Sequence, residues 1–423
     1  MRFTFTLPAI MILACAASRA QVVPAAAGPA AAGGQAGVQA SGTLRYALRY
    51  TQIAQFYNGP QGNAESSTLS GDASYQNANP VRPFSLTYVG GRMWNNSGGS
   101  YGLGYFQHLL VSQGILKRHW SLNLSNDVSL MPEAPITGFA GIPGVSGPPS
   151  VPGQPSQQIL TLNTRSVDNM STVNFTRSID HATSLSTTGS YGILRFPDGN
   201  GLEVNQLLIT PQIIRRLNAL NSIFCGYSLS RFSYPGYAVD TDTQSFPCGY
   251  LRIWNRRFST SISAGPERVS TSGGTATPPT IGLFLSAGVN YQQRSTSAAL
   301  SYTQTTTGNG GALIAFGSRN HDVNANFSRQ FGKNLTISAF GAYMRTQALI
   351  EIGALNLNLG GVTNSKFGGA SASRPLGRYL NINASYTAVQ QSSSAMLLSN
   401  AILGLSQTVS FGIGYTPREK HFK

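Results

Sequence analysis

Apolar and polar side chains alternate along most of the chain from residue 43 onward. Near the start of this region Leu44, Tyr46 and Leu48 occupy every second position, and near its end Phe411 and Ile413 do the same. Successive side chains of an extended strand point to opposite faces, so a period of two predicts strands with one apolar and one polar face. The polar face is built mostly from Ser, Thr and Asn, and seldom from charged residues.

The alternation divides into about 18 segments, most of them longer than the roughly 9–11 residues that a strand needs to cross a membrane. Pro211 falls inside one of them and predicts a sheet edge, a bulge or a strand boundary, because proline cannot donate a ladder hydrogen bond. The expected strands span residues 42–57, 66–77, 82–95, 103–115, 118–130, 166–180, 182–195, 202–215, 218–232, 241–255, 257–269, 280–292, 295–307, 318–330, 333–347, 361–373, 378–390 and 404–416.

The connections between these segments alternate between short and long. Lys117-Arg118 and Arg294-Ser295 are short, whereas residues 131–165 and 308–317 form long connections. Transmembrane barrels sort their connections in this way, with short periplasmic turns and longer extracellular loops, and a soluble sandwich has no reason to do so. We therefore expect an all-β fold, a transmembrane antiparallel up-and-down β-barrel of about 16–18 strands with both ends of the chain in the periplasm.

Composition excludes several other classes of protein. Charged residues make up 10% of the chain, against roughly 25% in ordinary soluble proteins. The one long apolar run, near residues 5–17, is too short for a spanning helix, which needs about 20 residues. With 18 Tyr and 20 Phe, the chain is not disordered throughout. A cytosolic enzyme and a helical membrane protein are both disfavoured.

The N-terminal residues predict export. Arg2, an apolar stretch and Ser18-Arg19-Ala20 have the order of a secretory signal peptide, with cleavage expected after Ala20. A lipoprotein signal ending at Cys15 is the alternative. Residues 21–41 are rich in Ala, Gly and Pro and predict a flexible segment. The barrel then occupies residues 42–416, and 417–423 form a basic tail.

Basic residues gather at the expected short turns. The formal net charge is +15. Side chains of this kind anchor a barrel at the membrane interface, whereas nucleic-acid binding needs a contiguous basic patch. Charges spaced around a ring therefore predict a membrane anchor and no nucleic-acid partner. The residues concerned are Arg82, Lys117, Arg118, Arg215, Arg216, Arg256, Arg257, Arg294, Lys333, Arg374 and Arg378.

Two arginines differ from this ring because they lie within the first expected strand. Arg45 and Arg49 alternate with the apolar face, so we expect them to point into the lumen. Unpaired, they would give a water-filled pore a preference for anions. Alternatively they pair with acids on the same face, for which Asp127, Asp168 and Asp322 are the candidates.

Cys225 and Cys248 remain after removal of the expected signal peptide. A hairpin turn centred near residues 236 and 237 places them opposite each other, or one register step off, on the ninth and tenth strands. A cross-strand disulfide is therefore predicted if their Cα atoms come within about 7 Å. Two buried thiols are the alternative.

These features together resemble bacterial outer-membrane β-barrels of porin size, over residues 42–416. The segment 410–415 partly resembles their C-terminal assembly signal, although Pro417 stands in place of the final aromatic residue. The resemblance implies an outer-membrane location, contact with outer-membrane lipid, insertion by the outer-membrane assembly machinery and, often, homo-oligomers. Aromatic residues suited to the membrane interface stand near expected strand ends at Trp94, Trp120, Tyr291, Phe331, Tyr343, Tyr379 and Tyr415.

The long connection 131–165 is dense in Pro and Gly, which excludes a helix or a central strand and favours a series of turns. In porin-like proteins a long loop of this kind can fold inward and narrow the pore, and the alternative for this loop is a surface position facing outside. We take inward folding as the hypothesis, and the candidate constriction residues are Thr137, Gly138, Phe139, Ile142 and Pro143.

The sequence contains no recognised catalytic or cofactor motif in a suitable context. The five histidines are scattered, and no clustered metal ligands are evident. No cofactor and no enzymatic activity are expected. The predicted function is passive diffusion of small polar or anionic solutes through an outer-membrane channel. The alternatives are a non-conducting structural or adhesive barrel that uses its long loops, an exopolysaccharide-export partner and an outer-membrane lipid hydrolase.

Overall fold

A computed structural model describes residues 42–57, 63–77, 79–95, 104–131, 165–199, 202–237, 239–273, 279–307, 318–332, 334–349, 361–394, 403–418 and 420–422. The expected signal peptide and the flexible segment after it lie outside these residues. No helix in the described part of the chain is long and apolar enough to cross a membrane.

The regular structure of these residues consists of strands in one antiparallel sheet. The strands are β1 (Gly42–Tyr57), β2 (Ala64–Asn77), β3 (Phe84–Asn95), β4 (Gly104–Leu116), β5 (Trp120–Met131), β6 (Ser166–Ser178), β7 (Thr183–Arg195), β8 (Val204–Arg216), β9 (Asn221–Gly226), β10 (Ser228–Ser233), β11 (Val239–Ser245), β12 (Cys248–Asn255), β13 (Phe258–Gly273), β14 (Thr280–Gln293), β15 (Thr296–Thr307), β16 (Ser318–Phe331), β17 (Leu335–Ala348), β18 (Val362–Leu376), β19 (Leu380–Ser393), β20 (Gly404–Tyr415) and β21 (Lys420–Phe422).

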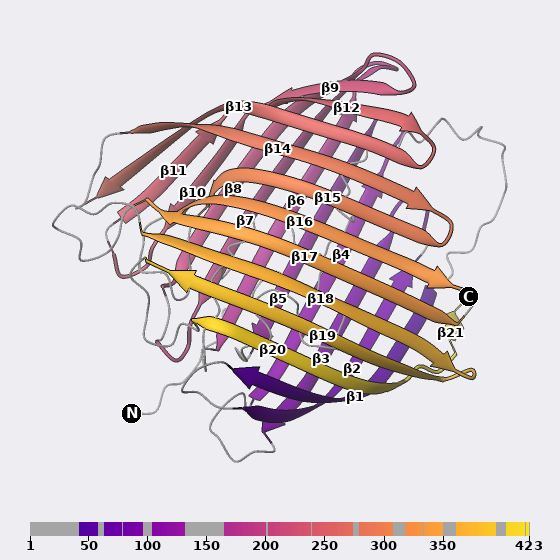
Figure 1. The fold of residues 1–423 in the computed structure, drawn as a ribbon. Coiled ribbons are helices and arrows are strands. Elements are labelled where there is room, and N and C mark those ends of the chain that lie inside the picture. The colour runs from indigo at the N-terminus through magenta and orange to yellow at the C-terminus, as the bar shows by residue number, and fades with distance from the viewer. Residues whose placement is uncertain are drawn as a thin grey trace, which may run out of the picture.

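The sheet closes into a barrel because β1 pairs with β2 on one side and with β20 on the other. Strands β9 and β10 together form one crossing of the barrel, and β11 and β12 form the next, so the closed barrel has 18 strands. The short strand β21 adds to the same seam by pairing with the first residues of β1. Figure 1 shows the tilted strands wrapping around a common axis. The predicted fold class is confirmed.

The two interrupted crossings meet at a row of prolines. Pro211 of β8 and Pro247, between β11 and β12, lie on either side of the β9–β10 crossing, where Tyr227 N donates to Pro211 O at 3.0 Å and Gly226 N donates to Pro247 O at 2.9 Å. Pro266 lies near the same level on β13, the next strand along the sheet. A proline has no N–H with which to donate a hydrogen bond to the neighbouring strand, so the hydrogen-bond ladder between these strands is interrupted at this level. The register is the same on both sides of the break. The expectation that Pro211 marks an edge, a bulge or a boundary is therefore wrong, since it lies within β8.

Glycine is required beside this row. A Cβ on Gly265 would collide with the backbone carbonyl of Phe246, and one on Gly226 would come within 2.7 Å of Pro211 O. The backbones of adjacent strands approach each other here more closely than a side chain permits.

The two faces of the barrel differ in polarity. Leu48, Ile213 and Phe411 are more than half exposed on the outer face, although they are large and apolar. The inward positions of the same wall carry small polar groups such as Thr51 and Ser410, which are nearly fully buried. An apolar exterior around a polar interior is the arrangement that lipid selects in a transmembrane barrel.

The connections are sorted as the sequence predicted. Residues 117–119, 179–182, 217–220, 256–257, 294–295, 332–334 and 377–379 join strands at one end of the barrel, the short-turn end. Gly42 of β1 pairs with Phe422 of β21 at this same end. The longer connections lie at the opposite, long-loop end, and several of them fall outside the described residues.

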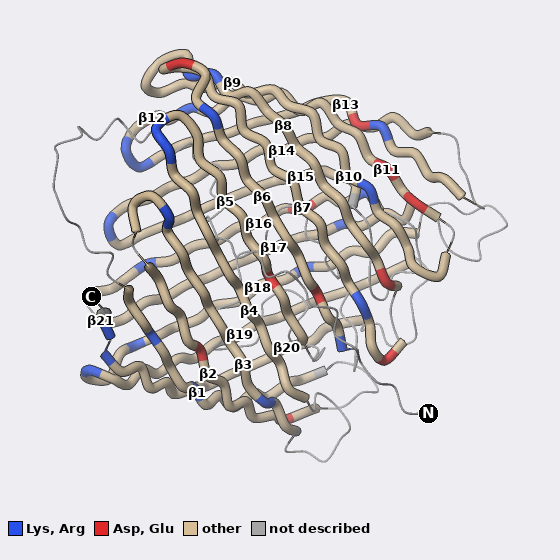
Figure 2. Tube along the Cα trace, turned by 180° about the vertical axis from the view of Figure 1, so that it is seen from behind, with Lys and Arg blue, Asp and Glu red and all other residues tan. Residues whose placement is uncertain are grey.

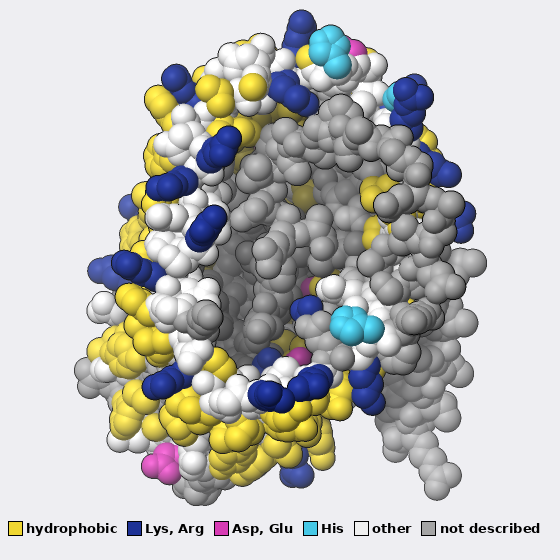
Figure 3. Space-filling view, turned by 90° about the vertical axis from the view of Figure 1, so that its right-hand side faces the viewer, with side chains coloured by type: hydrophobic (Ala, Val, Ile, Leu, Met, Phe, Trp, Pro, Cys, Tyr) yellow, Lys and Arg dark blue, Asp and Glu magenta, His cyan; other side chains and the backbone are white. Residues whose placement is uncertain are grey.

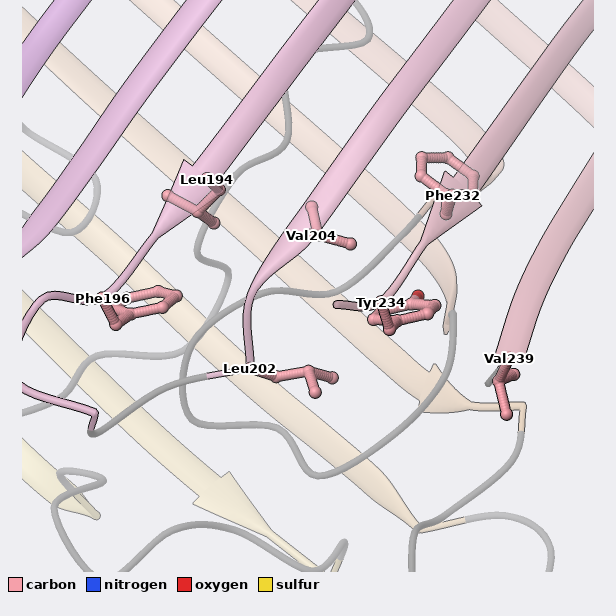
Figure 4. Close-up of a cluster of buried hydrophobic side chains, with 7 residues drawn as sticks. All are labelled: Leu194, Phe196, Leu202, Val204, Phe232, Tyr234 and Val239. Carbon is pink, nitrogen blue, oxygen red and sulfur yellow. The ribbon is translucent and has the colours of Figure 1, made fainter. Parts of the chain in front are cut away.

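A hydrophobic cluster lines the inner face at the long-loop end. Its members come from the ends of β7, β8, β10 and β11 and the residues next to them, as Figure 4 shows, and they are Leu194, Phe196, Leu202, Val204, Phe232, Tyr234 and Val239. Leu349, directly after β17, packs against the cluster. Strand β17 is not a neighbour of these strands in the sheet, so the contact reaches across the interior and narrows it at this end.

Candidate functional site: the lumen and its basic mouth

The lumen wall is polar and internally hydrogen-bonded. Neighbouring strands share hydroxyl pairs, for example Ser385 Oγ and Ser410 Oγ at 2.6 Å and Thr363 Oγ1 and Ser393 Oγ at 2.7 Å. Hydroxyl groups both donate and accept, so such a wall can exchange hydrogen bonds with water or with a polar solute.

Arg49 forms an ion pair with Asp72 of β2, with Nη2 and Oδ1 2.9 Å apart. Both side chains are about three-quarters buried on the inner face. The sequence predicted an inward Arg49 and offered Asp127, Asp168 and Asp322 as partners, but the partner is Asp72. Alternation alone could have included Asp72, because it shares the inward face of β2 with buried Ser66, Thr68 and Ser70.

Asp127 has a different partner from the one predicted. His108 of β4 approaches it with Nε2 and Oδ1 2.7 Å apart, and both residues are buried in the wall. Sequence reasoning treated His108 as one of several scattered histidines and missed this pair. An imidazole paired with a carboxylate also occurs in hydrolase sites, but here the pair is covered and a substrate cannot reach it.

Asp168 and Asp322 also face inward. Asp168 shares its face of β6 with buried Met170 and Thr172, and Asp322 shares its face of β16 with buried Ser318 and Asn320. Neither lies in the immediate register of Arg45 or Arg49, which sit on β1. The structure therefore places the predicted lumen charges on one face but does not bring them together as one cluster.

Glu267 is an inward-facing acid that sequence reasoning did not single out. It is almost fully buried, and its carboxylate accepts hydrogen bonds from Thr306 N at 3.2 Å and Thr306 Oγ1 at 3.0 Å. On the N-terminal side of Leu285, strand β14 continues to pair with β13 but no longer pairs with β15. Glu267 thus fills the gap between β14 and β15 at the long-loop end and satisfies an amide that has lost its ladder partner.

Arg319 of β16 reaches the same gap. Its Nη2 lies next to Gly282, and Glu267 Oε2 lies 3.7 Å from the point that a Cβ on Gly282 would occupy. Gly282 therefore leaves the space that the guanidinium group fills. Glu267, the hydroxyl of Thr306 and Arg319 together close the wall where β14 and β15 separate.

Lys and Arg ring the short-turn end. Figure 2 shows most of the blue segments at this end of the barrel, and Figure 3, which looks onto it, shows them around the rim of a hollow. The described members include Arg256, Arg257, Arg294 and Arg378. Aromatic side chains predicted for the interface are exposed beside them, among them Trp120, Phe331, Tyr379 and Tyr415. A ring of this kind attracts anions to the mouth.

Acids and bases pair at the opposite end. Arg165 donates to both carboxylate oxygens of Asp198, at 3.0 and 2.6 Å. This hydrogen bonding lowers the pKa of Asp198 from its ordinary value, because the charged form of the carboxyl is the one stabilised. Arg231 likewise bonds Asp240 at 2.5 Å.

A disulfide joins Cys225 of β9 to Cys248 of β12, with Cα atoms 4.1 Å apart. The two residues are direct register partners, as the position of the hairpin turn predicted. Their neighbours Ile213 and Ile223 are exposed, so the bond lies on the outer face of the barrel.

One set of predicted site residues cannot be compared with the structure. The candidate constriction residues Thr137, Gly138, Phe139, Ile142 and Pro143 lie outside the described residues. Within the described ranges no group of three or more His, Cys, Asp or Glu side chains could hold a metal ion.

The closed ladder, the apolar exterior, the polar interior and the sorted connections define a transmembrane β-barrel of porin size. No protein-family model matches the chain, and no curated protein sequence matches it either. Among solved structures it is similar to OccK2 (OpdF) of Pseudomonas aeruginosa, with a TM-score of 0.48 and 10% identity over 89% of this chain and 97% of the other.

A BenF-like porin of Pseudomonas fluorescens gives a TM-score of 0.48 and 10% identity over 89% of this chain and 98% of the other. The ferric citrate transporter FecA gives 0.43 and 10% identity over 83% of this chain and 60% of the other. Likeness at this level carries no argument about solutes, and the fold stands on the strand register itself.

Proposed function

We propose that the barrel is a passive channel for small polar solutes across the bacterial outer membrane. The single observation that carries this proposal is the closed ladder of 18 strands around an inward face of Ser, Thr, Asn and Gln. A barrel of about 16–18 strands encloses more volume than its own side chains fill, so water and solutes can enter it.

The lumen wall carries charges of both signs, so the wall itself gives the channel no strong preference for anions. The described inward face carries the arginines Arg45 and Arg49 on β1, and it also carries acids: Asp72 paired with Arg49, and Asp127 and Asp322 on other strands. The basic ring lies at the short-turn mouth instead. The basic residues at this mouth, rather than those of the lumen wall, therefore favour anions, because their field raises the local concentration of anionic solutes.

Planar-bilayer recording of the refolded protein tests the proposal. Stable conductance steps in KCl are the expected result, with a reversal potential under a salt gradient that gives the charge preference. Folding is checked separately by heat-modifiable mobility on a gel. A barrel that is folded yet silent would contradict the channel and leave a structural or adhesive role. Release of fatty acid from lipid vesicles by the folded barrel would point to a hydrolase.

A further inference from the structure

A cavity of about 710 Å³ opens at the short-turn end, next to the seam that closes the barrel. Its walls come from the first residues of β1, from the turn between β18 and β19, and from the chain between β20 and β21. These segments are distant in sequence, so the cavity exists only because the barrel is closed.

The path of the C-terminal residues creates this hollow. Strand β20 pairs with both β19 and β1 as far as Tyr415, and β21 resumes pairing with β1 where Lys420 meets Leu44. The tail uses one residue more than β1 between these two points, which is the geometry of a bulge. Pro417 lies in the bulge and cannot donate a ladder bond. The tail therefore follows β1 and leaves a gap toward the turn of β18 and β19.

Positive charge converges on the gap from three elements. Arg45 comes from β1, Arg378 from the β18–β19 turn and Arg418 from the tail, and the imidazole of His421 of β21 also lines the gap. A contact between His421 Nδ1 and Thr43 Oγ1 at 3.3 Å fixes the histidine against β1. No Asp or Glu belongs to the described lining of the cavity. Guanidinium groups match the oxygens of carboxylates and phosphates in pairs.

Two contacts hold the walls in place. Thr416 N donates to Tyr379 O at 2.7 Å, which ties the tail to the turn between β18 and β19. The rings of Tyr379 and Tyr415 lie 6.2 Å apart beside it. Arg45 and Asn381 stand on the inward faces of β1 and β19, whereas the exposed Leu380 is on the opposite face of β19, so the cavity lies at the rim of the barrel mouth. Its volume falls within the roughly 300–1,000 Å³ of small-ligand sites.

We propose that this cavity binds the oxyanion group, carboxylate or phosphate, of a small solute at the short-turn mouth of the pore. The role of this site in solute passage rests on the proposed channel function, whereas anion binding in the cavity does not depend on it. Arg378 and Arg418 grip the anion from opposite walls, and the C-terminal tail, which the sequence presents only as a basic extension, becomes one side of the site.

Equilibrium binding of radiolabelled citrate to the detergent-solubilised, folded full-length protein tests the proposal. The variant R378Q/R418Q is expected to lose about tenfold or more in affinity, since charge-assisted hydrogen bonds are lost. The matched control R256Q/R257Q removes the same charge from the β12–β13 turn of the same rim and is expected to change affinity less than about twofold. Equal losses in both variants would overturn the proposal, as would a wild type that does not bind citrate.

The source of the anion is decided in lipid nanodiscs. Citrate binding that is unchanged when phosphatidylcholine is replaced by phosphatidylglycerol supports a solute site. If phosphatidylglycerol competes with citrate and this competition depends on Arg378 and Arg418, the cavity binds a lipid headgroup, and the proposal of a solute site is overturned. Because binding is measured without current, failure of the channel in bilayers and failure of this site give different results.

Discussion

Cys225 and Cys248 stand directly opposite each other on the outer face of the barrel and are joined by a disulfide one residue away from Gly226 and Pro247. The bond thus links the ninth and tenth crossings at the level where the proline row interrupts their backbone ladder. The covalent link supplies a connection where backbone hydrogen bonds are missing. Disulfides persist in oxidising compartments outside the cytosol, which agrees with the export that the sequence predicts.

Replacing both cysteines tests this role. The sulfurs close a loop with a sequence separation of 23, so C225S/C248S is expected to lower the free energy of unfolding by roughly 3 kcal/mol on the chain-entropy estimate. The midpoint of the heat-induced gel-mobility shift measures this. Dithiothreitol should lower the midpoint of the wild type and leave that of the variant unchanged. Equal midpoints for the oxidised wild type and the variant would contradict the role.

The pair of His108 and Asp127 is predicted to couple energetically. Removing one partner leaves a buried polar or charged group without its bond, which costs about 1–3 kcal/mol or more. H108L and D127L alone should each lower the unfolding midpoint, and H108L/D127L should lower it by less than the two single changes together. A double-mutant cycle in the same gel assay gives the coupling. Strict additivity would show that the two side chains act independently.

Glu267 is predicted to hold the long-loop end of β15. In E267A the amide of Thr306 loses its acceptor, so its hydrogen exchange should accelerate, because an exposed or unbonded amide exchanges faster. Mass-spectrometric exchange of the peptide that contains Thr306 measures the effect. E65A removes an exposed carboxylate from the same end of the barrel and should leave that peptide unchanged. Protection in E267A equal to that of the wild type would refute the prediction.

Asp180 is predicted to make stability depend on pH at the short-turn end. Its Oδ1 accepts from Ala182 N at 2.6 Å and Thr183 N at 2.7 Å, and these bonds lower the pKa of the carboxyl in the folded state. A folded pKa below the unfolded value of about 3.9 means that the contribution is complete above that pH and is lost as the pH falls through the folded pKa.

D180A removes this contribution. The difference in unfolding midpoint between wild type and D180A should therefore be constant above about pH 5 and shrink below about pH 4. D180N keeps an acceptor oxygen for the turn and should retain part of the stability without this pH dependence. A difference that stays constant down to the lowest pH would show that the carboxylate is not responsible.

Much of the architecture follows from local properties of the chain. Alternation of apolar and polar residues defines the faces of each strand, because a strand has a side-chain period of two. The 18 crossings and the sorting of short and long connections were predictable for that reason. The pairing of Cys225 with Cys248 was also predictable, since a tight turn fixes the register of the two strands that it joins. The position of Pro211 was misjudged, because a proline inside a barrel wall is tolerated where the neighbouring crossing is interrupted at the same level.

What the sequence by itself determined is therefore which side of the wall each residue occupies. Only the closed tertiary structure decided which inward residues meet: Asp72 for Arg49, His108 for Asp127, and Arg45 beside Arg378 and Arg418. Alternation gives a side chain's face but neither its height along the barrel nor its neighbours on strands that are distant in sequence. Those depend on the stagger between strands and on the closure of β1 against β20 and β21.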